Sequence, residues 1–173
     1  MNISRFELPI STREGEYIAH YSEKGLAELD FPNADGLLTP KSGRAVSARQ
    51  VPLKVLQWHR LTTAALKKML AGLKPGPLPP LDWSGKTDFQ KNVWKAMLKI
   101  STGKTKSYGD IAMAIGNPKA VRAVGGACGA NPIPVLVPCH RVLAANNKLG
   151  GFSSGLDRKR DLLAREGVAF DEN

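Results

Sequence analysis

The sequence places a thiol, an imidazole and a guanidinium in successive positions, at Cys139, His140 and Arg141. A cysteine alone is more often a core residue than a reactive one. A thiol flanked by a base and a cation differs, because nearby positive charge lowers its pKa and favours the nucleophilic thiolate. The triplet follows an apolar, β-branched run at 131–137 that contains prolines and is typical of a short buried strand. We therefore predict that Cys139 is a nucleophile at the mouth of this strand.

Two short helices are predicted just before this strand. A capping pattern that pairs Ser107 with Asp110 begins the first helix, and Gly116 ends it. Asn117 as N-cap and Pro118 in the first turn then begin the second helix almost at once. So tight a turn between two short helices indicates a helix-turn-helix.

The second of these helices would present two different faces. The face expected to pack inward carries Val121, Val124 and Cys128, and the opposite face carries Lys119, Arg122 and Gly126. The pair Gly125 and Gly126 lowers helix stability by roughly 1 kcal/mol each relative to alanine. Close approach to an outside surface, such as the floor of a DNA groove, would explain them. Tight helix packing inside the protein would explain them equally well, and these residues alone leave both possibilities open.

The amino-terminal part of the chain is expected to form a hairpin and a helix. Strand patterns at 15–21 and 26–31 flank a turn, and 33–44 is rich in loop-forming residues. Apolar residues at helical spacing predict a helix at 53–70. No catalytic constellation is gathered in this part of the sequence.

A proline-rich segment separates that part from the rest. Residues 73–81 contain four prolines and a glycine, so no helix can run through them. We place a domain boundary there, with a first domain at 1–80 and a second at 81–173. In the second domain, a capping box predicts a helix from 87 to 100, and a final helix is expected at 154–166.

The charge of the chain is strongly basic, with a formal net charge of +10. Between residues 104 and 160 there are nine basic residues against only Asp110 and Asp157. Such a field would attract a polyanion such as nucleic acid, and it is also compatible with a merely soluble basic surface. No apolar run approaches the roughly 20 residues of a membrane helix. The sequence begins without a signal peptide and has two cysteines, so we expect a reducing compartment, cytoplasmic or, in a eukaryote, nuclear.

Several motifs together resemble the O6-alkylguanine-DNA alkyltransferases. The likeness covers roughly residues 87–168, and the motifs occur in the order found in that family. They are Ser107-Tyr108-Gly109, the run from Gly116 to Ala127, Asn131-Pro132 and Pro138-Cys139-His140-Arg141. The resemblance implies a mixed α/β (α+β) protein: a small strand-helix, ribonuclease-H-like domain, then a mainly helical, winged-helix-like domain with the helix-turn-helix.

The resemblance also implies roles for residues around the thiol. Neighbours on a strand point to opposite faces, so His140 could reach Cys139 only through a turn or a bridging water. The resemblance implies the water: Glu166 would orient His140, and His140 would take the Cys139 proton through it. Tyr108 would offer its hydroxyl hydrogen to the departing base. Asn131 would brace the cysteine strand against the recognition helix.

DNA contacts and a base pocket follow from the same resemblance. The helix would lie in the minor groove, with Arg122 filling the gap left by a flipped nucleotide. The remaining DNA-binding residues would be Lys119, Ala120, Ala123, Gly125 and Gly126. The base pocket would comprise Val142, Phe152 and Ser153. Two departures are Phe152 in place of a common tyrosine, which bears on the alkyl groups that fit, and Ser101 in place of a common proline.

The implied reaction is DNA repair by irreversible alkyl transfer. An alkyl group on O6 of guanine, or O4 of thymine, would pass to Cys139 once per protein molecule, with no cofactor and no metal. The implied partners are double-stranded DNA containing alkylated guanine and also single-stranded DNA, with no membrane and a monomeric protein.

Three functions other than alkyl transfer would also use parts of this sequence pattern. A Cys-His hydrolase would use the same thiolate but leaves the basic helix-turn-helix and Arg122 unexplained. A non-enzymatic lesion sensor would resemble relatives that have lost the cysteine, which is present here. A transcription regulator could use the same helices as an added role, but it leaves the Cys139 motif without a purpose.

Overall fold

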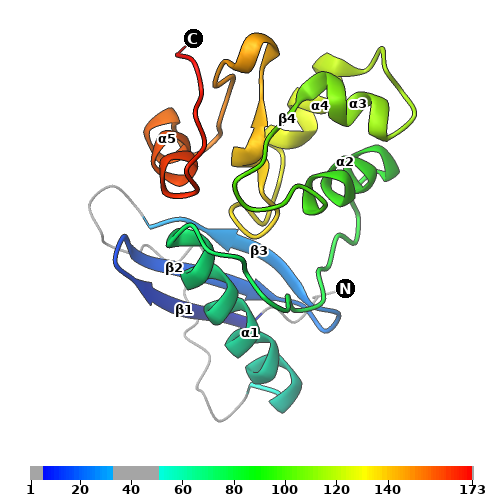
Figure 1. Cartoon of the computed structure of the whole chain (residues 1–173). Coiled ribbons are helices and arrows are strands. Elements are labelled where there is room, and N and C mark those ends of the chain that lie inside the picture. Colours follow the sequence, from blue (N-terminus) through cyan, green and yellow to red (C-terminus); the bar gives the residue numbers. More distant parts are fainter. Residues whose placement is uncertain (1–5, 33–50, 173) are drawn as a thin grey trace.

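The structure is a computed structural model that describes residues 6–32 and 51–172. Its first half is an antiparallel sheet in the order β1 (Phe6–Thr12), β2 (Gly15–Tyr21) and β3 (Leu26–Asp30). The central strand β2 pairs with β1 from Phe6 to Thr12, and with β3 from Leu26 to Asp30. The helix α1 (Leu53–Leu70) packs on one face of this sheet (Figure 1).

The second half is mainly helical. It contains α2 (Asp88–Leu98), α3 (Tyr108–Ala114), α4 (Val121–Gly129) and α5 (Leu156–Arg165). Two short parallel strands, β4 (Lys106–Ser107) and β5 (Val142–Leu143), join the start of α3 to the segment that follows the cysteine. Single 3-10 turns lie at Cys139–Arg141 and Ala145–Asn147. Figure 1 shows α2, α3 and α4 grouped on one side and α5 on the other.

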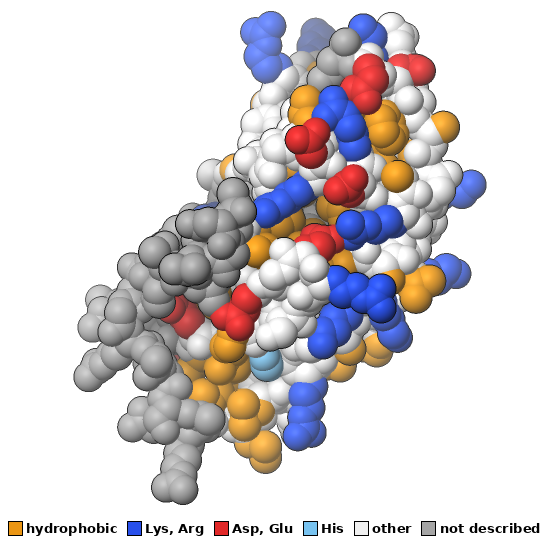
Figure 2. Space-filling model, turned by 90° about the vertical axis from the view of Figure 1, so that its left-hand side faces the viewer, with side chains coloured by type: hydrophobic (Ala, Val, Ile, Leu, Met, Phe, Trp, Pro, Cys, Tyr) orange, Lys and Arg blue, Asp and Glu red, His pale blue; other side chains and the backbone are white. Residues whose placement is uncertain are grey.

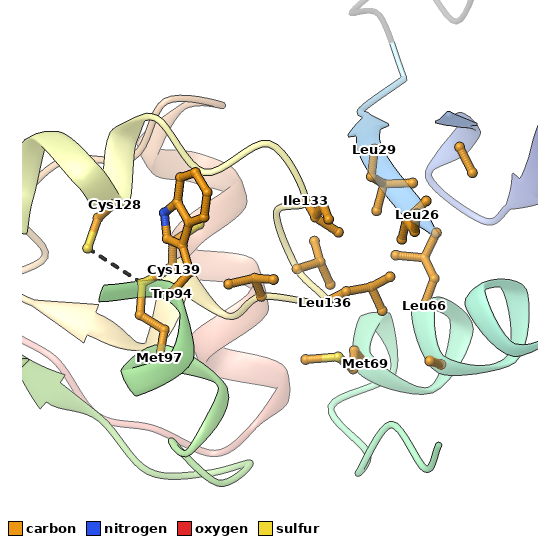
Figure 3. Packing of buried hydrophobic residues seen from close by; sticks show 14 of the residues in the cluster. Leu26, Leu29, Leu66, Met69, Trp94, Met97, Cys128, Ile133, Leu136 and Cys139 are labelled. Atoms are coloured by element: carbon orange, nitrogen blue, oxygen red, sulfur yellow. Dashed lines mark hydrogen bonds between the residues drawn. The ribbon is translucent and has the colours of Figure 1, made fainter. Parts of the chain in front are cut away.

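One hydrophobic core runs through both halves. Side chains of the sheet and α1, among them Leu29 and Met69, meet Ile133 and Leu136 from the segment before Cys139 (Figure 3). The core continues on the far side to Trp94, which is fully buried. A backbone hydrogen bond of 2.9 Å from Leu29 to Pro132 ties the same surfaces together. The cysteine segment is therefore clamped between the halves, and the division at 80/81 stays a prediction.

The proline-rich segment is also anchored on the sheet. Leu26 donates a 2.8 Å hydrogen bond to Pro80 and accepts one of 2.8 Å from Asp82. The contact is so close that a Cβ added at Gly25 would lie 2.2 Å from the Pro80 carbonyl oxygen. Gly25 is thus required by the approach of another backbone.

Most elements expected from the sequence pattern are present. The mixed α/β class, the hairpin of β2 and β3 and the helix at 53–70 are confirmed. The capping boxes of α2 and α3 are both formed. Strand β1 was missed because Pro9 interrupts its pattern, as an edge strand can tolerate. The expected loop at 33–44 lies outside the described residues.

Two features of the helix-turn-helix were predicted wrongly. The second helix begins at Val121, not at Pro118, and Asn117 makes no cap; residues 117–120 form a turn closed by a 3.0 Å hydrogen bond from Ala120 to Asn117. The later start places Val121 in the first turn, where its side chain is 42% exposed instead of packed inward. Val124 and Cys128 do face the core.

Within residues 6–32 and 51–172, no helix combines the length and apolar character required to cross a bilayer.

Candidate active site

The segment before Cys139 is a pair of tight turns, not the strand that the sequence predicted. Leu136 donates to the Pro134 carbonyl, and Cys139 donates to the Val137 carbonyl, at 2.9 and 2.8 Å. Bonds between residues two apart define γ-turns. The burial was predicted correctly, but Pro138 (φ −80°, ψ 67°) adopts the inverse γ conformation and reverses the chain. An apolar run alone cannot distinguish such turns from a strand.

The centre of the first turn is strained. Val135 has φ 69°, which a β-branched residue rarely adopts and which costs on the order of 1–3 kcal/mol. Its side chain is fully buried, so packing holds it there. In this conformation the backbone amides of Val135 and Cys139 act to lower the pKa of the Cys139 thiol. The strained turn thus places polar backbone groups near the thiol.

Asn131 braces this loop from inside. Its side-chain amide donates to the Val137 carbonyl at 2.8 Å and accepts from the Ile133 amide at 3.0 Å. The same side chain acts to lower the pKa of the Cys139 thiol. Asn131 is 9% exposed and fixes both ends of the turn.

Behind the thiol, His140 and Glu166 form a buried pair. Nε2 of His140 lies 3.0 Å from Oε1 of Glu166, and both side chains are at most 1% exposed. A carboxylate at the C-terminal end of a helix opposes the helix dipole, so the burial of Glu166 has to be explained by its partners. Glu166 follows the last residue of α5, while His140 sits in the 3-10 turn.

Arg141 is the second partner of the glutamate, and its role was missed. Its guanidinium donates to both Glu166 oxygens at 2.9–3.1 Å, to the Ile100 carbonyl at 2.7 Å and to Thr102 Oγ1 at 3.1 Å. The Gly103 amide donates to Glu166 as well, at 3.0 Å. Burial alone would raise the pKa of Glu166, but these bonds lower it to about 2.

His140 is held neutral with a defined tautomer. Burial lowers its pKa despite the carboxylate beside it. Because an ionised carboxylate only accepts hydrogen bonds, the proton must sit on Nε2. Nδ1 is then a bare acceptor, buried and without a hydrogen-bond partner in the described structure. This nitrogen is able to take up a proton.

The pKa of Cys139 is raised, so the expectation that His140 and Arg141 would lower it is wrong. Burial raises the pKa of this thiol, and Asn131, the Lys159 charge and nearby backbone amides offset only part of that effect. The reason is that Arg141 is neutralised by Glu166 and His140 is uncharged. The resting thiol is protonated, so a base has to remove its proton.

The thiol opens on a cavity of about 300 Å³. Three side chains predicted to surround it do so: Tyr108, Phe152 and Ser153. The other lining residues are Gly125, Cys128, Gly129, Cys139 and Gly151. Val142 was expected in this pocket but does not line it; its side chain is fully buried beneath.

Tyr108 can donate a hydrogen bond into this cavity. Its hydroxyl oxygen accepts from the Gly151 amide at 3.4 Å, which leaves the O–H proton free of that bond. Burial raises its pKa, so the hydroxyl keeps this proton at neutral pH. Tyr108 is the first residue of α3, directly after its capping Ser107.

Helix α4 and the turn before it present a surface of small residues and cations beside the cavity. On α4, Arg122, Ala123 and Gly126 are exposed; in the turn, Lys119 is exposed and Ala120 is half-buried. A Cβ added at Gly125 or Gly126 would meet nothing within 4 Å. Internal packing therefore does not require glycine at either position, which removes one of the two explanations that the sequence left open.

The chain is similar to known proteins in both sequence and structure. The sequence model of one protein family, the DNA-binding domain of 6-O-methylguanine DNA methyltransferase, matches residues 88–168. An O6-methylguanine methyltransferase from Mycobacterium tuberculosis has a similar crystal structure, with a TM-score of 0.70 and 34% identity over 94% of this chain and 93% of that one. The chain belongs to the O6-methylguanine methyltransferase family.

Curated members of the family match mainly the second half. A methylated-DNA–protein-cysteine methyltransferase from Methanosarcina acetivorans is 59% identical over 81 residues, which are 47% of this chain and 52% of that protein. One from Mycobacterium tuberculosis is 58% identical over 86 residues, 50% and 52% of the two chains. These sequence alignments thus span about half the length of the curated relatives.

Lys159 is a buried residue of this family member that sequence reasoning missed. Its side chain is fully buried, and its ammonium donates to the carbonyls of Val142, Leu149 and Gly151 at 2.5–3.2 Å. Burial lowers the pKa of Lys159 to about 8, and the nearby thiols oppose this shift. Its apolar neighbours on α5, such as Leu162 and Leu163, were the sequence signal that this face of the helix is inside.

The charge count of the sequence overstated the basic surface around the site. Arg141 and Lys159 are internal, and Arg160 is paired with Asp157 and Glu172. On the face seen in Figure 2, acidic side chains lie among the basic ones in the upper part of the view. Exposed cations remain on and near the α3–α4 unit, at Lys104, Lys106, Lys119 and Arg122.

The buried carboxylate of Glu166 should make the unfolding free energy fall in acid. The pKa of Glu166 is depressed from 4.5 to about 2, so its stabilisation is present above about pH 4.5 and lost as the pH falls towards 2. Between pH 5 and pH 3 the wild-type protein should lose about 2 kcal/mol of unfolding free energy from this group alone. Glu166→Gln should lose less over the same interval. Urea unfolding at the two pH values measures this, and equal losses in both proteins would contradict it.

Proposed function

We propose that this protein repairs DNA by transferring an alkyl group from O6 of alkylated guanine to Cys139. The observation that carries the proposal is a cavity lined by both the buried Cys139 and Tyr108. The neutral His140, which follows Cys139 in the chain, has a buried base nitrogen without a hydrogen-bond partner in the described structure. Membership of the methyltransferase family supports this reaction over a hydrolytic one.

The proton of the thiol would leave through His140. A water between Cys139 and Nδ1 of His140 would pass the proton to the imidazole, and Glu166 would stabilise the imidazolium that forms. The low pKa of Glu166 suits this role, because the carboxylate stays ionised throughout. A base is needed because burial keeps the thiol protonated.

The bond changes would balance as an in-line substitution. The thiolate of Cys139 attacks the alkyl carbon, a C–S bond forms, and the electrons of the C–O bond pass to guanine. Tyr108 donates its hydroxyl proton to the base and so avoids a free anion. The thioether product has no activated carbon, so the protein would react once. O4-alkylthymine would be a second substrate of the same chemistry.

The base would be read by the cavity wall. Phe152 would cover one side of the ring, and the Ser153 amide would face O6. The Val142 carbonyl is engaged by Lys159, so its part would be to shape the pocket from beneath. No cofactor or metal takes part in this proposal.

DNA would bind at the α3–α4 helix-turn-helix, a winged-helix-like unit. A crystal structure of a Mycobacterium tuberculosis relative, 35% identical with a TM-score of 0.67, is described as a complex with DNA. Here Arg122 would enter the base stack in place of the flipped nucleotide, and Lys119 would contact phosphate. The small residues Ala120, Ala123, Gly125 and Gly126 would allow close approach to the minor groove. Duplex DNA would be the main partner and single-stranded DNA a second one.

The proposal also covers the two domains of the chain, its oligomeric state and its cellular compartment. The first half would be a ribonuclease-H-like domain at 1–80, and the second a DNA-binding and active-site domain at 81–173. The protein would act as a monomer in a reducing compartment, cytoplasmic or nuclear, where Cys139 stays a free thiol.

A substitution at the nucleophile tests the reaction. Cys139→Ala should abolish transfer of a labelled methyl group from an O6-methylguanine oligonucleotide to the protein. DNA affinity should remain close to that of the wild type, because phosphate contacts come from Lys and Arg side chains. Cys128→Ala is the matched control, since this second thiol lines the same cavity and should not be required. Labelling of Cys139→Ala at the wild-type rate would rule out the proposal.

A substitution on α4 tests the DNA surface. Gly126→Ala should stabilise the fold by up to about 1 kcal/mol, because alanine favours a helix and the added Cβ meets no neighbour. The same variant should bind duplex DNA more weakly, since the methyl group would keep the helix from the groove. Thermal unfolding and fluorescence-anisotropy titration measure the two effects. Unchanged or tighter DNA binding would show that this face does not approach DNA.

A further inference from the structure

One wall of the Cys139 cavity is backed by the other half of the chain. Phe152 lines the cavity, and its ring meets Phe31 edge-on, with centroids 6.4 Å apart and planes at 79°. Phe31 follows directly after β3, so it comes from the sheet half of the molecule. A residue 121 positions away in the sequence therefore supports the pocket wall.

Phe31 itself is held firmly. The Tyr17 ring of β2 packs against it with centroids 5.4 Å apart. On another side, the guanidinium of Arg158 lies 4.6 Å from the ring centroid. Arg158 also donates a 2.7 Å hydrogen bond to the Pro32 carbonyl, which ties α5 to the chain just beyond the ring. Figure 1 shows this end of β3 beneath α5.

Because the cavity is small, the contact of Phe31 with Phe152 affects which ligands can fit. About 300 Å³ is the lower end of the range for ligand pockets, so a purine with a small alkyl group would leave little spare space. A larger group could enter only if a wall moved. Phe152 is the largest apolar side chain of the wall, and it cannot move towards Phe31 while that ring fills the space behind it.

We propose that Phe31 is a specificity-determining residue that limits the size of the transferred alkyl group. It acts by positioning Phe152 and touches no reacting atom, so the thiolate attack and the departure of guanine are unchanged. The inference rests on the proposed function and deepens it, because it gives the sheet half of the protein a part in substrate selection. The substrate class it predicts for the wild-type protein is guanine with small O6-alkyl groups.

The test compares two lesions in one oligonucleotide sequence, O6-methylguanine and O6-benzylguanine. Phe31→Ala should raise the ratio of benzyl to methyl transfer rates roughly tenfold, because the Phe152 ring can swing into the vacated space. The methyl rate should stay near that of the wild type. Phe31→Leu, which keeps most of the volume, should change the ratio little. Leu8→Ala is the control for general loosening, because Leu8 packs on the same core in strand β1.

A double variant tests whether Phe31 acts through Phe152. If Phe31 acts through Phe152, adding Phe31→Ala to Phe152→Ala should raise the ratio no further, whereas independent effects would multiply. Should Phe31→Ala fail to fold, Arg158→Met, which loosens the ring without removing it, should raise the ratio by a smaller factor.

Three results would overturn the inference. One is an unchanged ratio in folded Phe31→Ala, another is an equal rise in Leu8→Ala, and the third is a multiplicative effect in the double variant. Absence of any methyl transfer by the wild-type protein would instead overturn the proposed function, and this inference with it.

Discussion

The carboxylate of Glu166 is buried at the wrong end of a helix, and much of the site depends on how it is compensated. A negative charge just after the last turn of α5 opposes the helix dipole, and its side chain is 1% exposed. Arg141, His140 and the Gly103 amide supply the compensation. These partners come from two separate segments, the 3-10 turn at Cys139–Arg141 and the turn that contains Gly103. Removing one of them would leave a buried charge without its partner, which typically costs 3–5 kcal/mol.

The same cluster determines what the neighbouring side chains can do. Glu166 fixes the proton of His140 on Nε2 and leaves Nδ1 as an unpaired base on the residue after Cys139. It also neutralises the charge of Arg141, so this cation does not keep the Cys139 thiol in its ionised form. A protonated, buried nucleophile beside an unpaired base suits a reaction in which deprotonation and attack are coupled to substrate binding. In this account, structural stability and proton transfer rely on one set of hydrogen bonds.

The sequence predicted local elements better than it predicted their long-range partners. Periodicity and capping residues were enough for α1, α2 and the start of α3, because those signals act within a few residues. The run at 131–137 was correctly predicted to be buried, but the strained turn at Val135 depends on packing from both halves of the chain. No local pattern reports such a contact.

The count of charged residues was the least reliable guide to the basic surface, again because burial depends on long-range partners. Arg141 and Lys159 count as basic residues in the sequence, yet one is paired with Glu166 and the other is enclosed by carbonyl oxygens. Their burial depends on partners up to 41 residues away. Cys139, Tyr108, Phe152 and Ser153 could be predicted to meet only through the resemblance of whole motifs, and the structure brings them to one cavity.

If Cys139 keeps the alkyl group permanently, each protein molecule can repair only one lesion. Wild-type protein would be mixed with a large excess of duplex DNA containing O6-methylguanine, and repaired lesions would be counted against intact protein mass over time. We expect about one repaired lesion per molecule and then no further repair. The protein mass should rise by one methylene unit, located on the peptide that contains Cys139. Continued turnover without that modification would exclude permanent transfer to Cys139 and favour a hydrolytic reaction.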